Sequence, residues 1–186
     1  AVRAVWFYRD RHTRDRHSLP TRRSCDLVDQ DNKEEITPFG IETAAGCDRT
    51  AMTVLVDAYD EEGEGKDQRV VLRFHPRIAP ITVAVFPLVK KEGMPDKAEQ
   101  IEGELRREFR TAIEYNQSIG RRYRRQDEIG TPFCVTIDGD SMVDDTVTLR
   151  DRDSMDQERV AVSELASVLR QRMAAWTRPQ IVETEA

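Results

Sequence analysis

The second half of the chain alternates between short apolar runs and stripes of apolar residues at helical spacing. Residues 81–89 (ITVAVFPLV) are almost continuously apolar, which is typical of a strand buried on both faces of a parallel sheet. Pro95 suits the first turn of a helix, and apolar residues then recur every three or four positions. The predicted inner face of this helix consists of Ala98, Ile101, Leu105 and Phe109.

The alternation continues toward the end of the chain. Strands are predicted at 112–115, 133–137 and 146–150, with the turn of a hairpin at 138–145 and a return toward the core at Val160 and Val162. Residues 79–176 therefore form one α/β domain, in which a βαβαβ unit is followed by a hairpin and a last helix.

Two more helices belong to this domain. Ser118 is a candidate N-cap of the second helix, and Gly130 suits its C-terminal cap. The predicted inner face of the second helix is Ile119, Tyr123 and Ile129. Ser163 is a candidate N-cap of the last helix, which carries Leu165, Val168, Leu169, Met173 and Trp176. The sheet is expected to be mixed, with about five strands and three helices, and 177–186 is expected to be a tail.

A different pattern precedes the domain boundary, which we place near Ala79. Residues 39–42 predict a short strand and 43–46 a turn of small residues, followed by a helix that opens near Asp48, its candidate N-cap. The apolar face of that helix is Met52, Leu55, Val56 and Tyr59. Residues 60–68 (DEEGEGKDQ) predict a solvated loop.

Residues 69–80 predict an apolar stretch that enters a connector bounded by prolines. His75 lies in this connector as a lone histidine between Phe74 and Pro76. We expect its ring to pack or to form hydrogen bonds, because no second catalytic group accompanies it.

Residues 1–27 differ from the rest, since they are rich in Arg and His and show little apolar periodicity. A basic arm that binds nucleic acid is one interpretation, and a targeting peptide is a poorer one because acidic residues occur early. We favour a third, because the run resembles translated sequencing-adapter read-through. Native sequence would then resume near Val28, and 28–78 would form a separate segment.

Composition narrows the class of protein. Of the 186 residues, 38% are hydrophobic and 34% are charged, and the formal charge is −6. A net negative chain does not grip nucleic acid with its whole surface, so any such contact needs a local basic patch. No apolar run approaches the length of a membrane span. The three cysteines form no C-x-x-C pair, which predicts neither a zinc site nor a disulfide framework and indicates a reducing cytoplasm.

The stretch IETAAGCDRT (41–50) has the chemistry of an anion site. Its small residues let a ligand approach the backbone, and Arg49 falls in the first turn of a helix, where free N–H groups favour phosphate. Glu42, a few residues before Arg49, offers a negative charge that could bind the amine of an amino acid. On spacing alone, an ordinary α/β core explains the same pattern.

A second candidate surface is the run SIGRRYRRQDEIG (118–130). Its arginines repel one another, so either nearby acidic residues or a polyanion must offset the cost. A solvated helix with salt bridges is one interpretation, and a site for single-stranded bases and phosphates is the other.

The sequence of residues 41–50 closely resembles motif 3 of class II aminoacyl-tRNA synthetases, as this motif occurs in the dimeric-type glycyl-tRNA synthetases. The resemblance implies that Arg49 is catalytic and binds ATP together with Gly46, Cys47 and Asp48. It also implies a glycine site made by Glu42, Thr43, Ala44, Ala45 and Gly46. The family usually has Pro and Ser where this chain has Thr43 and Ala44.

Residues 118–133 and the run TLRDRDSMDQERV (148–160) resemble the anticodon-binding domain of the same family. This resemblance implies tRNA contacts by Arg121, Arg122, Tyr123, Arg125 and Arg152. The family further implies glycine, tRNA(Gly), ATP and Mg²⁺ as ligands, a homodimer for the full enzyme and a cytoplasmic location. The expected fold is the end of a class II catalytic core followed by the anticodon-binding domain.

Motifs 1 and 2 of the family are not found in this chain, so we expect that the chain alone neither activates glycine nor dimerises as the family does. Two other classes stay open. One is a non-catalytic nucleic-acid or polymerase accessory module that keeps the anticodon-binding fold. The other is a flavodoxin-like binder of small molecules, which the absence of a Gly-rich phosphate loop after Phe86 disfavours.

Overall fold

The computed structural model describes residues 45–63, 65, 68–91 and 93–179, together with two strands before them. These strands, β1 (Leu27–Val28) and β2 (Glu35–Ile36), form an antiparallel pair in which Leu27 lies opposite Ile36. They belong to a unit that is separate from residues 46–186. The strand predicted at 39–42, the rest of segment 1–27 and the tail from residue 180 lie outside the described residues.

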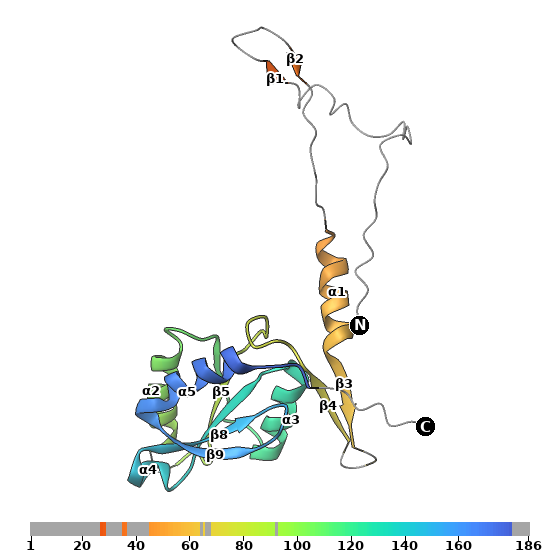
Figure 1. Ribbon diagram of the computed structural model, residues 1–186. Helices are drawn as coiled ribbons and strands as arrows, with labels where there is room; N and C mark the ends of the chain where they lie inside the picture. Colours follow the sequence, from red (N-terminus) through yellow and green to blue (C-terminus); the bar gives the residue numbers. More distant parts are fainter. Residues whose placement is uncertain are drawn as a thin grey trace. The chain divides into compact units, whose positions relative to one another are not determined.

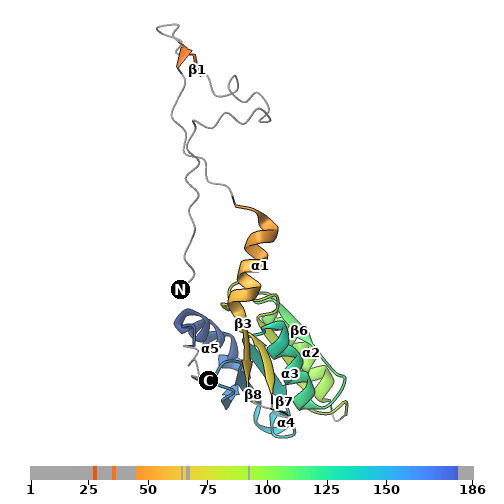
Figure 2. The same cartoon turned by 90° about the vertical axis from the view of Figure 1, so that its right-hand side faces the viewer.

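The second unit begins with α1 (Cys47–Ala58), which continues directly into β3 (Tyr59–Glu62) (Figures 1 and 2). β3 pairs antiparallel with β4 (Arg69–Leu72). The prediction of a loop at 60–68 was therefore wrong for its first three residues. The prediction failed because this strand reads Tyr-Asp-Glu-Glu and carries no apolar alternation.

Five strands form the main sheet in the order β6-β5-β7-β8-β9. β5 pairs in parallel with β6 and β7, whereas β7–β8 and β8–β9 are antiparallel. The bounds are β5 Val83–Pro87, β6 Thr111–Ile113, β7 Phe133–Ile137, β8 Thr146–Asp151 and β9 Gln157–Ala161. The mixed sheet is confirmed, and β9 is a strand that the sequence pattern did not delimit.

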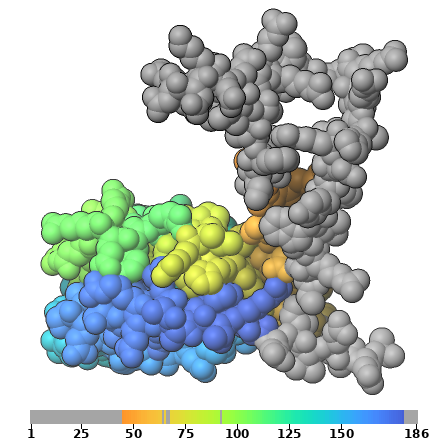
Figure 3. All heavy atoms as spheres, turned by 45° about the horizontal axis from the view of Figure 1, so that its top comes forward, coloured from red at the N-terminus to blue at the C-terminus, as the bar shows by residue number. Residues whose placement is uncertain are grey.

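Helices cover both faces of this sheet. One face packs on α2 (Met94–Leu105) and α5 (Val162–Ala175). The predicted inner residues of α2 are buried, as is Phe109 just after its end, and in α5 Leu165 and Leu169 are buried. Val168 and Met173 are partly buried, whereas Trp176 lies beyond the end of α5 and packs against His75. Figure 3 shows this face, with α2 in green beside α5 in blue. The other face packs on α3 (Ile119–Ile129), through Ala84, Phe86 and Cys134. A one-turn helix, α4 (Ser141–Asp144), fills the turn that was predicted before β8.

Two predicted helix caps are corrected. The N-cap of α1 is Gly46 rather than Asp48, which lies in the first turn. α5 begins at Val162 after Ala161, so Ser163 is inside the helix. Ser118 and Gly130 do flank α3 as predicted, although the Ser118 side chain makes no capping hydrogen bond.

Buried ion pairs hold the β3–β4 hairpin to the sheet domain. The carboxylate of Asp127 on α3 is 0% exposed and accepts hydrogen bonds from Arg150 Nη1 at 2.9 Å and Nη2 at 3.0 Å. It also accepts a hydrogen bond from Arg69 Nη1 of β4 at 3.2 Å. Arg73 donates to Asp60 at 2.8 Å and to Asp153 at 2.9 Å. The hairpin is therefore packed against the sheet domain, and the boundary at Ala79 stays a prediction.

Gly130 shapes the contact between α3 and the segment after β4. Its φ of 88° lies in the left-handed region, and a Cβ at this position would lie 2.5 Å from Phe74 Cδ2 and 2.7 Å from the Leu72 carbonyl oxygen. We expect Gly130→Ala to lower the free energy of unfolding by about 2–3 kcal/mol, because the backbone strain and the clash both act. Urea unfolding followed by circular dichroism measures the change.

Gly103 provides the matched control, because it lies in α2 with nothing within 4 Å of its Cβ position. Gly103→Ala should stabilise the protein by about 0.5–1 kcal/mol, since alanine favours the helix. Equal stability of the two variants would contradict the role of Gly130.

Candidate functional site

The residues predicted to bind glycine and ATP lie at the start of α1 as far as the structure describes them. Ala45, Gly46, Cys47, Asp48 and Arg49 are all exposed. Arg49 falls in the first helical turn, as predicted, and its guanidinium has no partner among the described residues. An exposed cation beside free N–H groups suits an anion.

The other predicted glycine contacts, Glu42, Thr43 and Ala44, lie outside the described residues. The structure thus does not test whether Glu42 and Arg49 share one site. The pairing of these two side chains remains a prediction.

The predicted apolar face of α1 is exposed to solvent. Met52 is 63% exposed and Val56 is 69% exposed, and Leu55 and Tyr59 are about half exposed. Near its C-terminal end, α1 packs through Ala58 and Val54 against Phe74 and Ala79. Apolar side chains exposed together on one helix indicate a surface that another part of a protein covers.

The arginine-rich helix α3 divides its cations between the surface and the core. Arg121 and Arg124 are exposed, whereas Arg122 is only 2% exposed. Arg125 is partly buried and pairs with Glu114 at 3.1 Å. The arginines of α3 that were predicted to bind tRNA therefore do not share one exposed surface, because Arg122 is buried.

Tyr123 is oriented by contacts within the domain. The centroid of its ring lies 5.7 Å from that of Phe86 in an edge-to-face arrangement. The Arg150 guanidinium carbon lies 4.8 Å from the same ring centroid. The Tyr123 hydroxyl forms a hydrogen bond with the Thr136 hydroxyl at 2.7 Å. Burial raises the pKa of the Tyr123 phenol above its usual value. These contacts compete with the predicted stacking on a base.

Arg152 is fully buried, and its predicted contact with tRNA is replaced by contacts inside the protein. Its Nη1 donates to the carbonyl oxygens of Leu72, Phe74 and Gly130 at 2.9–3.1 Å. Its Nε donates to Asp153, whose other oxygen accepts from Trp176. Arg152 thus joins the hairpin segment to the end of α3, and it is inaccessible to a ligand.

His75 performs the packing role that was predicted for it. Its ring centroid lies 4.9 Å from that of Trp176, and its Nδ1 accepts a hydrogen bond from the Arg77 amide.

The carboxyl ends of the parallel strands β5, β6 and β7 meet at one edge of the sheet, which we call the carboxyl edge (residues 88–91, 114–118 and 138–145). Ligands of open α/β sheets bind at such edges. Lys90, Lys91 and Asn116 are exposed there, beside Leu88 (42% exposed) and Val89 (44%). Arg121 lies in the first turn of α3, directly after this edge.

These carboxyl-edge residues were missed in the analysis of the sequence. The available signal was the Lys-Lys pair directly after the buried strand, which read only as a loop. Its basic charge is not cancelled by Asp138 at the end of β7, because Arg159 pairs with that carboxylate at 2.6 Å. The hydrogen bond from Arg159 lowers the pKa of Asp138 to about 2. The segment 138–145 of the edge is acidic, since Asp138, Asp140 and Asp144 all lie within 4 Å of Arg159 and Asp145 pairs with Lys97. The exposed cations and apolar side chains of the edge lie in the segment 88–91, a pairing that suits single-stranded nucleic acid.

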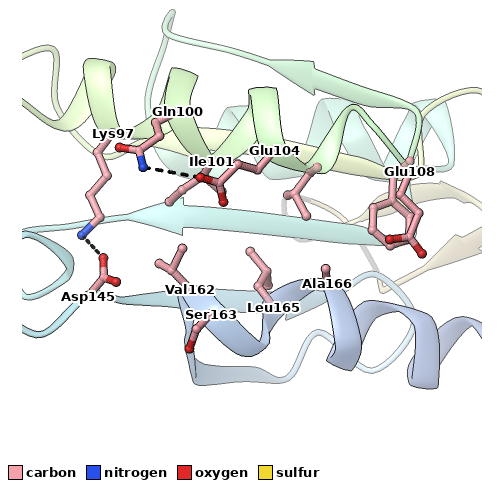
Figure 4. A pocket seen from close by; sticks show the side chains of 12 residues that line it. Lys97, Gln100, Ile101, Glu104, Glu108, Asp145, Val162, Ser163, Leu165 and Ala166 are labelled. Atoms are coloured by element: carbon pink, nitrogen blue, oxygen red, sulfur yellow. Dashed lines mark hydrogen bonds and ion pairs between the residues drawn. The ribbon is translucent and has the colours of Figure 1, made fainter.

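A groove of about 340 Å³ lies on the face of the sheet that α2 and α5 cover, between these two helices, and Asp145 of the carboxyl edge lines one end of it (Figure 4). Leu105 and Leu165 line it, Lys97 pairs with Asp145 at one end, and Glu104 and Glu108 flank it. Two carboxylates repel phosphate, so this groove is a poor nucleotide site.

The part of the chain that the structure describes holds neither a cluster of metal-binding side chains nor a helix that could span a membrane. No cluster of three or more His, Cys, Asp or Glu side chains is placed there to hold a metal ion. None of the described helices has the length and apolar character that crossing a membrane requires.

Comparison with protein families gives one match, the family described as "Anticodon binding domain", at residues 82–172. These residues include the whole five-stranded sheet and the helices α2, α3 and α5.

The chain is also similar to curated glycine–tRNA ligases. It is 50% identical to that of Treponema denticola over 169 residues, which are 88% of this chain and 38% of the relative. It is 46% identical to that of Rhodopirellula baltica, over 87% of this chain and 32% of the relative. The chain thus spans about a third of the length of the curated relatives it matches.

The match to the Clostridium acetobutylicum enzyme, at 45% identity, covers 91% of this chain. A match of that extent includes part of residues 1–27, wherever its ends fall. The hypothesis of a non-native start is therefore confined to the portion outside the match.

Among solved structures, the chain resembles prolyl-tRNA synthetase from Cryptosporidium parvum, with a TM-score of 0.52 and 21% identity. The likeness covers 55% of this chain and 22% of the other. At this identity the likeness supports the fold alone.

Proposed function

Because this chain belongs to the glycine–tRNA ligase family, we propose that it forms part of an enzyme that joins glycine to tRNA(Gly) with ATP. The observation that carries the proposal is the identity of 45–50% to three such ligases, over 87–91% of this chain. The similarity includes the sheet domain together with the segment around α1, so it exceeds that of a shared anticodon-binding fold alone.

In the proposed enzyme, the residues at the start of α1 serve the activation of glycine. Arg49 holds the triphosphate of ATP and stabilises the charge that develops on the leaving pyrophosphate. Glu42 holds the ammonium group of glycine, in the site to which Thr43, Ala44 and Ala45 contribute. Gly46 has no side chain, so ATP can approach the backbone of the turn closely. Cys47 and Asp48 contact ATP mainly through their backbone groups. Bound Mg²⁺ would add positive charge at the phosphates of ATP.

The chain by itself does not activate glycine in this proposal. Glycine activation depends on positioning several groups around one adenylate, and the described residues supply Arg49 without an enclosing pocket. The exposed apolar face of α1 supports this view, since the catalytic core of the full enzyme would cover it. The homodimer and the cytoplasmic location belong to the proposed full enzyme.

The sheet domain recognises the anticodon at its carboxyl edge in this proposal. Lys90, Lys91 and Arg121 contact phosphates, and Leu88 and Val89 offer apolar surface to unstacked bases. Of the residues first predicted to bind tRNA, the exposed Arg121 and the partly buried Arg125 fit this role best.

Binding of an RNA hairpin with the anticodon stem and loop of tRNA(Gly) tests this proposal. We expect the chain to bind it, and the double variant Lys90→Gln/Lys91→Gln to bind several-fold more weakly with a smaller dependence on salt, because each lost phosphate contact lowers the slope by about 0.7–1. Fluorescence anisotropy across a salt series measures both quantities.

Arg170→Gln is the matched control, because Arg170 is an exposed cation on α5 that pairs with Glu108 near the groove. Equal affinity for a hairpin with a scrambled loop, or equal losses in the control and the double variant, would contradict anticodon recognition at the carboxyl edge.

A further inference from the structure

Arg122 extends from α3 beneath the carboxyl edge, where it contacts the backbone of two loops. Its Nη1 donates to the Pro87 carbonyl oxygen at 2.7 Å and to that of Glu114 at 3.2 Å. Its Nη2 donates to the Leu88 carbonyl oxygen at 3.3 Å, and the guanidinium lies 5.4 Å from the centre of the Phe86 ring. One side chain therefore fixes the backbone directly after β5 and directly after β6.

Further contacts extend this arrangement to the exposed side chains. The Glu114 carboxylate accepts hydrogen bonds from Arg125 Nη1 at 3.1 Å and from Gln126 Nε2 at 2.8 Å. At the tip of the loops, Lys90 Nζ donates to Asn116 Oδ1 at 2.7 Å. The two loops are thus held from below by α3 and are joined above by exposed polar groups.

The burial of Arg122 is costly, and the fold does not offset it as it does for its neighbours. Arg69 and Arg150 each pair with the buried Asp127, whereas Arg122 forms no ion pair among the described residues, and its buried Nε finds no hydrogen-bond partner there. Burial accordingly lowers the pKa of Arg122, although the charge of Glu114 opposes the shift. A buried cation that donates to carbonyl oxygens without an ion pair often stabilises a fold no more than an apolar residue of similar size would.

We infer that Arg122 is a positioning residue, which holds the loops at 88–91 and 114–117 in the arrangement that receives RNA. This inference rests on the proposed function. Phosphate and base contacts depend on where Lys90 and Asn116 stand, and a loop held in its bound form loses less conformational freedom on binding. Arg122 itself stays buried and does not contact the RNA.

The variants Arg122→Lys and Arg122→Met test the inference, with the same RNA hairpin. Lysine keeps the charge and loses the planar fork, and methionine loses both. We expect both variants to bind at least about tenfold more weakly, because the exposed side chains must now be ordered on binding. Val147→Ala, which truncates a fully buried residue on the α2/α5 side of the sheet, is the control for lost stability and should bind like the parent chain.

Hydrogen–deuterium exchange supplies a readout that does not require RNA. Amides at 88–91 and 114–117 should exchange faster in Arg122→Lys than in Val147→Ala. Affinity within twofold of the parent in both Arg122 variants, weakening in the methionine variant alone, or equal weakening in Val147→Ala would overturn the inference. If the parent chain fails to bind RNA, the proposed function falls, and unchanged exchange in Arg122→Lys would still overturn the positioning role by itself.

Discussion

Replacing Asp127 by alanine is expected to lower the free energy of unfolding by about 3–5 kcal/mol, the cost of removing one partner of a buried ion pair. The carboxylate is completely buried and pairs with two arginines, one from β8 and one from β4. Its removal leaves Arg69 and Arg150 charged in the interior with fewer acceptors. Burial by itself would lower the pKa of Arg150, and the hydrogen bonds and charge of Asp127 raise it instead. Chemical denaturation of the chain and the variant measures the loss.

Two controls isolate the contribution of the ion pairs. Glu108→Ala removes an exposed carboxylate that pairs with the exposed Arg170, and it should change stability by less than about 1 kcal/mol. The double variant Asp127→Leu/Arg150→Met removes one buried pair together and should recover part of the loss. A loss from Asp127→Ala no larger than that from Glu108→Ala would show that the buried carboxylate does not hold the hairpin.

The second large effect concerns catalysis in the complete enzyme. Arg49→Ala should slow the activation of glycine by roughly 10²–10³-fold, the scale for losing one preorganised group that stabilises developing charge. The reason is the position of Arg49 in the first turn of α1, where its guanidinium and the helix N-terminus attract the same anion. ATP–pyrophosphate exchange with glycine measures the rate, in an enzyme that combines this sequence with the remainder of the Treponema denticola relative.

Arg49→Lys provides the conservative comparison, because it keeps the charge and loses the planar fork. Its rate should fall between those of the parent and the alanine variant. A near-normal rate in Arg49→Ala would remove the role proposed for this residue, and robust exchange by the 186-residue chain alone would contradict its dependence on the rest of the enzyme.

The sheet domain was predictable because its pattern is strong. Within the apolar run predicted at 81–89, residues 83–87 form the buried strand β5, and the apolar stripe of α2 packs in the predicted core. The last two residues of the run, Leu88 and Val89, are instead exposed beyond the end of the strand. Glycine also predicted the end of a helix correctly where the chain adopts a left-handed conformation, as Gly130 does at the C-terminal cap of α3.

The interior arginines were not predictable from the pattern of apolar residues. Arg122 and Arg152 read as surface cations, because arginine is rarely buried unless it is paired. Both arginines donate to backbone carbonyl oxygens, those of Pro87 and Leu72 among them, which carry no sequence signature. Arg152 also pairs with Asp153, the next residue in the sequence. For the same reason the inner face of α3 includes Gln126 and Asp127, beside the apolar residues that were predicted.

Because α1 continues directly into β3, the number of residues at this junction is constrained. Ala58 is the last helical residue and Tyr59 the first of the strand, so no spare residue separates them. One added amino acid at this junction would turn α1 by about 100° about its axis and shift it by about 1.5 Å. Evolution of this segment should therefore accept substitutions more readily than insertions, since a single extra residue would point Arg49 in a new direction.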